Sequence, residues 1–119
     1  MPIYVDPLGT YGWKIRGRTV RNCHMFTDAL DLEELHIFAE RIGLRRAWFQ
    51  DHRIAPHYDL TPSRREQALA CGAVDVNRRT AVALWQARRE LAVTLAAAVS
   101  AAAKPGADQG PCPSATSAS

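Results

Sequence analysis

The apolar residues of this chain recur with two periods, one typical of helices and the other of strands. The clearest helical period covers about residues 31–42, where the apolar positions are Leu32, Leu35, Ala39 and Ile42. Gly43 follows them and is suited to end a helix. The same reasoning predicts a second helix over about residues 62–71 and a long third helix that begins after Asn77 and frays past residue 100.

Short β-type runs between these helices predict strands over about residues 3–5, 18–27, 44–50 and 73–76. This alternation predicts an α/β fold, with a small, mostly parallel or mixed sheet flanked by helices. We expect a single domain of residues 1–103 that ends in the long helix. Residues 104–119 are rich in proline, glycine, serine and alanine and predict a disordered tail.

Composition agrees with one globular domain, since 47% of the 119 residues are hydrophobic and 23% are charged. The formal charge of +3 comes from thirteen arginines and two lysines, which favours anionic partners without proving nucleic acid. The three cysteines form no Cys-x-x-Cys pair, and the N-terminus lacks the pattern of a signal peptide. We therefore expect a cytoplasmic protein without a membrane segment.

The start of the second helix is a candidate anion site. Thr61 can act as N-cap and Pro62 fits the first helical position. The first turn contains Ser63, Arg64 and Arg65. Free N–H groups and arginines together favour a phosphate or carboxylate. The alternative is that Asp59 and Thr61 cap the helix while the arginines lie in solvent, and the sequence leaves both open.

A polar segment, residues 52–59, lies between the strand predicted over 44–50 and that helix. Ligands of open α/β sheets collect beyond the carboxyl ends of the strands. We expect Asp6, Gln50 and the polar segment at that edge, joined by His24 if its strand runs in the same direction.

Four residues are candidates for catalysis: His57, Asp59, His36 and Asp6. On an extended segment His57 and Asp59 point the same way, so one can orient the other as a general base. His36 has two interpretations, a base that faces a cleft or a core-edge histidine paired with a glutamate one turn away. Candidates for ligand binding are His24, Gln50, His52, Tyr58, Ser63, Arg64 and Arg65.

The same histidines and carboxylates have the ligand types of a divalent-metal site, but their spacing matches no established metal motif. A metal-bound centre and a metal-free acid–base centre therefore both stay open. The sequence also has no phosphate-cradling glycine loop and no dinucleotide fingerprint.

Several segments resemble a family of small bacterial and phage proteins catalogued as a domain of unknown function, DUF4031. They are Tyr4-Val5-Asp6-Pro7, Cys23-His24-Met25, residues 34–39, residues 48–52, residues 56–61 and Cys71-Gly72-Ala73-Val74. The resemblance covers about residues 2–90. It implies a compact cytoplasmic domain often encoded in phage or prophage DNA, and it implies no activity.

The function expected from the chemistry is recognition of an anion, with hydrolysis of a phosphorylated or nucleic-acid substrate through a His/Asp centre. The alternative is a non-enzymatic module that binds nucleic acid or another protein. Tryptophans and arginines suit stacking and phosphate contacts, although recognised nucleic-acid motifs are absent. Whether the chain is an enzyme stays open.

Overall fold

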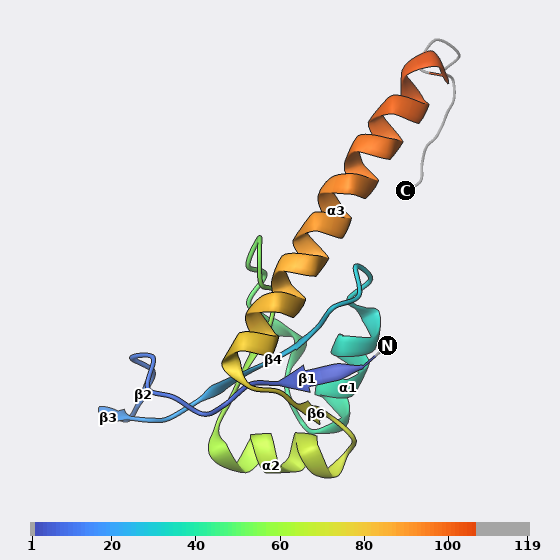
Figure 1. The fold of residues 1–119 in the computed structure, drawn as a ribbon. Coiled ribbons are helices and arrows are strands. Elements are labelled where there is room, and N and C mark those ends of the chain that lie inside the picture. Colours follow the sequence, from blue (N-terminus) through green and yellow to red (C-terminus); the bar gives the residue numbers. More distant parts are fainter. Residues whose placement is uncertain (1, 107–119) are drawn as a thin grey trace. The chain divides into compact units, whose positions relative to one another are not determined.

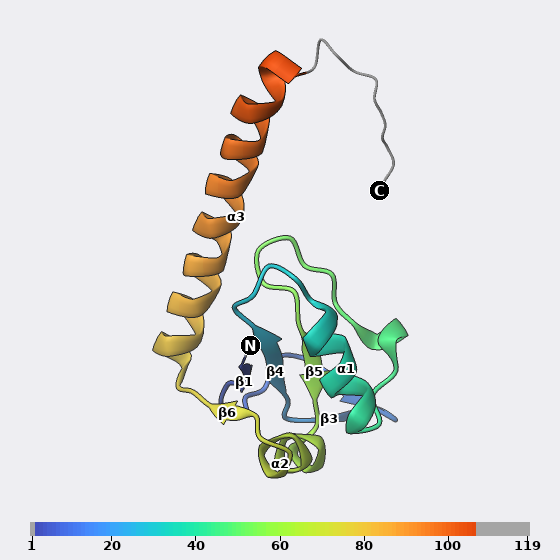
Figure 2. The ribbon, with the colours of Figure 1, turned by 90° about the vertical axis from the view of Figure 1, so that its right-hand side faces the viewer.

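The computed structural model describes residues 2–106, and side chains as far as residue 101. The chain divides into a unit of residues 1–88 and a unit of residues 89–119. The first unit is built on a four-stranded sheet in the order β5-β4-β1-β6, of which Figure 1 labels β4, β1 and β6 and Figure 2 also labels β5. Its strands are β1 (Ile3–Val5), β4 (Cys23–Thr27), β5 (Tyr58–Leu60) and β6 (Val74–Asp75). β6 is parallel to β1, whereas the other two pairings are antiparallel, so the predicted α/β fold with a mixed sheet is confirmed.

Three α-helices, one 3₁₀ helix and a small hairpin complete the described chain. The helices are α1 (Glu33–Arg41), η1 (Arg46–Trp48), α2 (Pro62–Ala70) and α3 (Arg78–Gly106). The hairpin pairs β2 (Lys14–Ile15) with β3 (Arg18–Thr19). All three helices predicted from periodicity are confirmed, and α3 continues past residue 100. The predicted tail lies, from residue 107 on, outside the described residues.

Local signals explain where these helices begin and end. The Thr61 hydroxyl accepts the backbone N–H of Arg64 at the start of α2, and Asn77 accepts that of Thr80 at the start of α3. Gly43 and Gly72 follow α1 and α2 with φ of +86° and +108°. Only glycine adopts such a backbone without strain, so both positions terminate their helices.

The two faces of the sheet have different neighbours. Alternate residues of the strands, such as Val5, Met25 and Leu60, are fully buried and form the core with apolar residues of α1 and α2. The opposite face meets the first turns of α3, where the Trp85 ring packs on Phe26 at a centroid distance of 4.6 Å. Figure 2 shows α1 on one side of the sheet and the start of α3 on the other.

The strand predicted over residues 44–50 is wrong. Leu44 enters the core, but residues 46–48 form η1, and Trp48 is 48% exposed. The place beside β4 is taken by β5, within the segment that we interpreted as a polar loop. His57-Tyr58-Asp59-Leu60 alternates polar and apolar residues, which is the pattern of a half-buried strand. The aromatic run at 48–49 was the stronger apolar signal, and it concealed this alternation.

The strand directions also determine where the polar residues lie. β4 alone runs in the opposite direction, because β6 is parallel to β1 and β5 is, like β1, antiparallel to β4. The carboxyl ends of β1, β5 and β6 therefore lie on one side, whereas His24, near the start of β4, reaches Asp59 through antiparallel pairing. His24, His57 and Asp59 lie on one face of the sheet.

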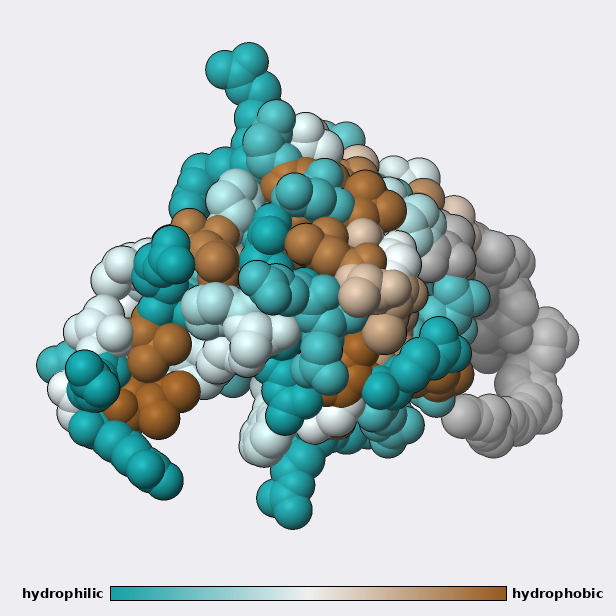
Figure 3. All heavy atoms as spheres, turned by 90° about the horizontal axis from the view of Figure 1, so that it is seen from below, coloured by the Kyte–Doolittle hydropathy of each residue, from teal (hydrophilic) through white to brown (hydrophobic). Residues whose placement is uncertain are grey.

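Outside the core, the surface of the molecule is mixed. Seen from below, hydrophilic and apolar side chains are interleaved over the underside (Figure 3). Among the helices that the structure describes, none combines the length and apolar character needed to cross a bilayer.

Candidate functional site

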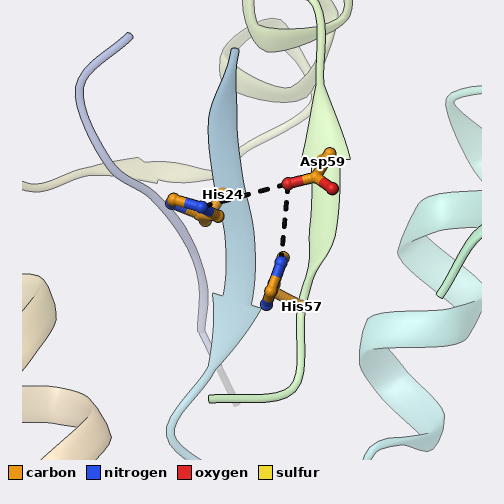
Figure 4. A group of neighbouring side chains, drawn as sticks. All are labelled: His24, His57 and Asp59. Carbon is orange, nitrogen blue, oxygen red and sulfur yellow. Dashed lines mark ion pairs between the residues drawn. The ribbon is translucent and has the colours of Figure 1, made fainter. Parts of the chain in front are cut away.

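A cluster of His24, His57 and Asp59 occupies the polar face of the sheet. His24 lies between the buried Cys23 and Met25 of β4 and therefore points to the other face. The strand register sets Asp59 of β5 directly opposite His24, and His57 precedes Asp59 by two residues on the same face. Figure 4 shows the three side chains turned toward one another from two adjacent strands.

The three side chains approach one another closely. Asp59 Oδ1 lies 3.5 Å from His57 Nε2 and 3.9 Å from His24 Nε2. One ligand atom of each residue lies within 4.8 Å of the other two. The side chains of His57 and His24 are 16% and 19% exposed, and that of Asp59 is 31% exposed. The cluster is thus mostly withdrawn from water but reachable from it.

The other ring nitrogen of each histidine has its own partner. His24 Nδ1 lies 2.8 Å from Asp6 Oδ2, and the backbone N–H of His24 donates to Asp6 Oδ1 at 2.6 Å. His57 Nδ1–H donates to the backbone carbonyl of Ala55 at 2.6 Å. Asp6 is 2% exposed, so it holds the His24 ring from below the surface.

Electrostatics favour an ion pair between His57 and Asp59 in the metal-free protein. Burial lowers the pKa of His57, but the hydrogen bond to Asp59, the Ala55 carbonyl and the nearby carboxylates outweigh burial and raise its pKa above 6.5. The hydrogen bond from His57 lowers the pKa of Asp59, against the opposing effect of burial. Both pKa shifts therefore favour the charged forms of the two side chains.

Aromatic and amide side chains enclose the cluster. The rings of Tyr11 and Trp85 lie 5.0 Å and 5.9 Å from the His24 ring, centroid to centroid. Asn22 Nδ2 donates to Asp59 Oδ1 at 3.3 Å. These neighbours restrict the rotation of His24 and Asp59 and keep the geometry of the cluster in place.

Asp59 also lines a hollow of about 460 Å³ on the surface. Trp13 and Trp48 contribute aromatic walls, and Gln50 and Arg64 contribute polar groups. A volume of this order accommodates a small organic ligand. The hollow therefore brings a binding space directly to one member of the cluster.

The three residues of the α2 first turn have different positions. Arg64 lines the hollow, and its Nη1 donates to the Ile42 carbonyl at 2.6 Å. Arg65 turns the other way: its Nε donates to the Asp6 carbonyl at 3.0 Å and its Nη2 pairs with Asp75 at 2.7 Å. Ser63 is exposed, with its hydroxyl 3.4 Å from that of Thr61. The capping alternative thus holds for Thr61 but not for Asp59, which lies in β5.

The structure does not bring His36 and Tyr58 to the cluster. Tyr58, which stands between His57 and Asp59 in the sequence, points into the core. Its hydroxyl lies 2.7 Å from His36 Nδ1. Burial first, and then repulsion from Arg46, lowers the pKa of His36 below 6.5. His52 is also apart, since its Nδ1 accepts the backbone N–H groups of Ile54 and Ala55 within its own loop.

Sequence reasoning missed several residues of the site. Asn22, Tyr11 and Trp85 were not among the candidate site residues. No local pattern identifies them, because each reaches the cluster through pairing or packing between distant segments. The signal that was available for His57 and Asp59 was their period-two spacing.

Comparison with known proteins gives one finding. A family model described as "Protein of unknown function (DUF4031)" matches residues 3–88, which include every residue of the cluster and of the hollow. No curated protein and no solved structure matches the chain.

Proposed function

The chain belongs to the DUF4031 family, and we propose that it is a hydrolase that cleaves a phosphate ester at the cluster of His24, His57 and Asp59. The observation that carries this proposal is the convergence of two imidazoles and a carboxylate beside a hollow. Groups that accept protons near neutral pH, held at one point next to a binding space, are the usual requirement for activating water.

The hollow supports a phosphorylated ligand. The Arg64 guanidinium and the start of α2 are positive, and both Arg64 and Thr61 line the hollow. Trp13 and Trp48 offer aromatic surfaces on which a base or another flat group can stack. A nucleotide, or the end of a nucleic acid, combines these two features in one molecule.

The reaction requires one proton transfer. The oxygen of a water molecule forms a bond to phosphorus while an imidazole Nε2 of the cluster accepts its proton. The bond between phosphorus and the ester oxygen breaks, and the alcohol leaves with the proton returned by the imidazole. The Ala55 carbonyl orients the imidazole of His57 and Asp6 orients that of His24, each through Nδ1, and Asp59 stabilises the imidazolium that forms. We also propose a cytoplasmic location, because thiols such as those of Cys23 and Cys71 stay reduced in that compartment.

Turnover of model esters tests the proposal. We expect the full chain to release nitrophenol from bis(p-nitrophenyl) phosphate or phosphate from nucleotides, assayed with and without added zinc. His57→Gln and Asp59→Asn should each lower kcat/KM by about 100-fold or more, as expected when a general base is lost.

Arg64→Met should raise KM and change kcat less, because Arg64 binds the anion rather than the reacting water. Asp51→Asn is the matched control, since Asp51 is exposed and belongs neither to the cluster nor to the lining of the hollow. Equal turnover by wild type and His57→Gln would contradict the proposal.

The aromatic walls favour a second candidate, a module that binds single-stranded nucleic acid without cleaving it. In that case Trp48→Ala should weaken binding, and the affinity of wild type should fall steeply as salt rises. Salt-dependent binding with no product would favour this function over hydrolysis.

A further inference from the structure

We infer that His24 Nε2, His57 Nε2 and Asp59 Oδ1 form a binding site for one divalent transition-metal ion, for which zinc is the best match. The inference deepens the proposed function by naming the group that activates water, since an ion bound to both Nε2 atoms would take over this role from the free imidazole. Only this catalytic use rests on the proposed function; the binding site itself rests on geometry.

Hydrogen bonds decide which ring nitrogens are free. A backbone carbonyl can only accept, so the contact with Ala55 requires a hydrogen on His57 Nδ1. An ionised carboxylate likewise only accepts, so Asp6 requires a hydrogen on His24 Nδ1. When both rings are neutral, each Nε2 therefore carries a lone pair and no hydrogen.

Both lone pairs are close to the same carboxylate oxygen, Asp59 Oδ1, at 3.5 Å and 3.9 Å. Three acceptors that face one point repel one another unless a positive group lies between them. A proton on His57 Nε2 removes the repulsion between His57 and Asp59. The lone pair of His24 Nε2 then still faces Asp59 Oδ1 with no hydrogen between them. A single cation between the three atoms removes all of these repulsions at once.

The spacing matches what a metal requires. With bonds of about 2.0–2.1 Å, the ligand atoms of a tetrahedral zinc site lie roughly 3.3 Å apart. The two Nε2 atoms lie 3.5 Å and 3.9 Å from Asp59 Oδ1, and one ligand atom of each residue lies within 4.8 Å of those of the other two. Small rotations of the side chains are therefore enough to close the site.

The surroundings are those of a metal site rather than of three surface residues. Histidines that bind metals usually donate their other ring N–H to a carboxylate or a backbone carbonyl, which fixes the tautomer. Asp6 does this for His24 and Ala55 does it for His57, while Asn22 donates to Asp59. Each of the three ligands thus has its own orienting partner.

Ligand chemistry selects the metal. Two imidazole nitrogens and one carboxylate oxygen suit zinc and its neighbours, whereas magnesium and calcium prefer oxygen ligands alone. Three protein ligands leave a coordination position for water. The cation would also offset the charges of Asp6 and Asp59, which otherwise repel a phosphate substrate.

Calorimetry on the full chain tests the site. Protein stripped with EDTA and desalted is titrated with zinc chloride and, separately, with magnesium chloride. We expect one zinc ion per chain and no saturable magnesium binding. Asp6→Asn should weaken zinc binding about 10–100-fold through loss of the His24 partner, and His57→Gln and Asp59→Asn should weaken it at least as much.

Cys71→Ser and Asp51→Asn are the controls, because they remove an exposed thiol and an exposed carboxylate that do not belong to the cluster. Both should bind zinc as wild type does. Absence of saturable zinc binding, or equal zinc affinity in wild type and His57→Gln, would overturn the inference.

Imidazole ¹⁵N spectra of the wild type give a test that does not depend on folded variants. Zinc should shift the Nε2 signals of His24 and His57 and leave those of His36 and His52 unchanged. Shifts at His36 or His52 instead would refute the site.

The two proposals can fail separately. Zinc bound at this site without turnover of any ester contradicts the hydrolase and leaves the metal site standing. Turnover that survives EDTA, in a chain that takes up no zinc, contradicts the metal site and leaves the hydrolase.

Discussion

The histidines of this protein differ in their protonation behaviour because their immediate partners differ. His57 has a carbonyl on one nitrogen and a carboxylate near the other, whereas His36 lies against Tyr58 and Phe49 in the core. The carboxylates raise the pKa of His57 despite its burial, while burial lowers that of His36. The first histidine is therefore equipped to hold a proton or a metal ion, and the second to stay neutral.

The lowered pKa of His36 predicts an acid-sensitive contribution to stability. In the unfolded chain His36 takes up a proton as pH falls below about 6.5, but the folded state resists protonation. The contribution is thus complete above pH 6.5 and is lost as pH falls toward the lowered pKa of the folded state, by at most ~1.4 kcal/mol per pH unit.

Thermal unfolding of wild type and His36→Gln checks this prediction. The fall in Tm between about pH 7.5 and about pH 5.5 should be smaller in the variant than in wild type. Equal falls in the two proteins would mean that His36 does not titrate on unfolding.

At the scale of elements, the turn after α1 supports one wall of the hollow. Gly43 has a φ of +86°, and a Cβ atom added there would lie 2.7 Å from Arg64 Nη1. The same nitrogen donates to the Ile42 carbonyl, the C-cap position of α1. The end of α1 and the first turn of α2 are therefore fitted to each other through this contact.

Gly43→Ala should lower the free energy of unfolding by about 1–2 kcal/mol, because the left-handed backbone disfavours a Cβ atom. It should also displace Arg64 and so raise KM in the ester assay. Urea unfolding measures the first effect. Gly72→Ala is the control, since Gly72 also follows a helix with a positive φ but has nothing within 4 Å of the added atom. A Gly43 variant that loses stability but keeps the KM of wild type would show that the turn does not position Arg64 in the hollow.

At the scale of the molecule, the fold and the candidate site belong to the first unit. Its buried apolar residues run from Ile3 to Ala81 among the described residues. Arg88 is near the end of this unit, and its guanidinium donates to the carbonyls of Ala29 and Leu30. The part of α3 beyond this contact adds no residue to the described core.

A chain that ends at residue 91 should therefore fold and bind zinc as the full chain does. We expect cooperative urea unfolding with a midpoint close to that of the full chain. A peptide of residues 92–106 should be largely unfolded in water, because isolated helices of about 15 residues are marginal. Loss of cooperative unfolding in the shortened chain would show that the later part of α3 supports the first unit.

The sequence alone determined much of this protein. Helical periods, caps and glycines identified α1, α2 and α3, and short β-type runs identified β1, β4 and β6, since these signals act over a few residues. The strand predicted over residues 18–27 is divided into β3 and β4. Spacing also placed His57 and Asp59 on one side of an extended segment. Their composition predicted an anion-binding or acid–base role, which stays a prediction.

Only the tertiary structure decided which residues share the site. The antiparallel pairing of β4 with β1 and β5 brings Asp6, His24 and Asp59 into line across three strands, and no local pattern encodes that register. The same pairing places Tyr58 and His36 on the opposite face. Strand pairing between distant segments determines which residues are neighbours in a sheet. The fold therefore decides that these polar residues form one cluster, whereas the sequence is equally consistent with a polar loop.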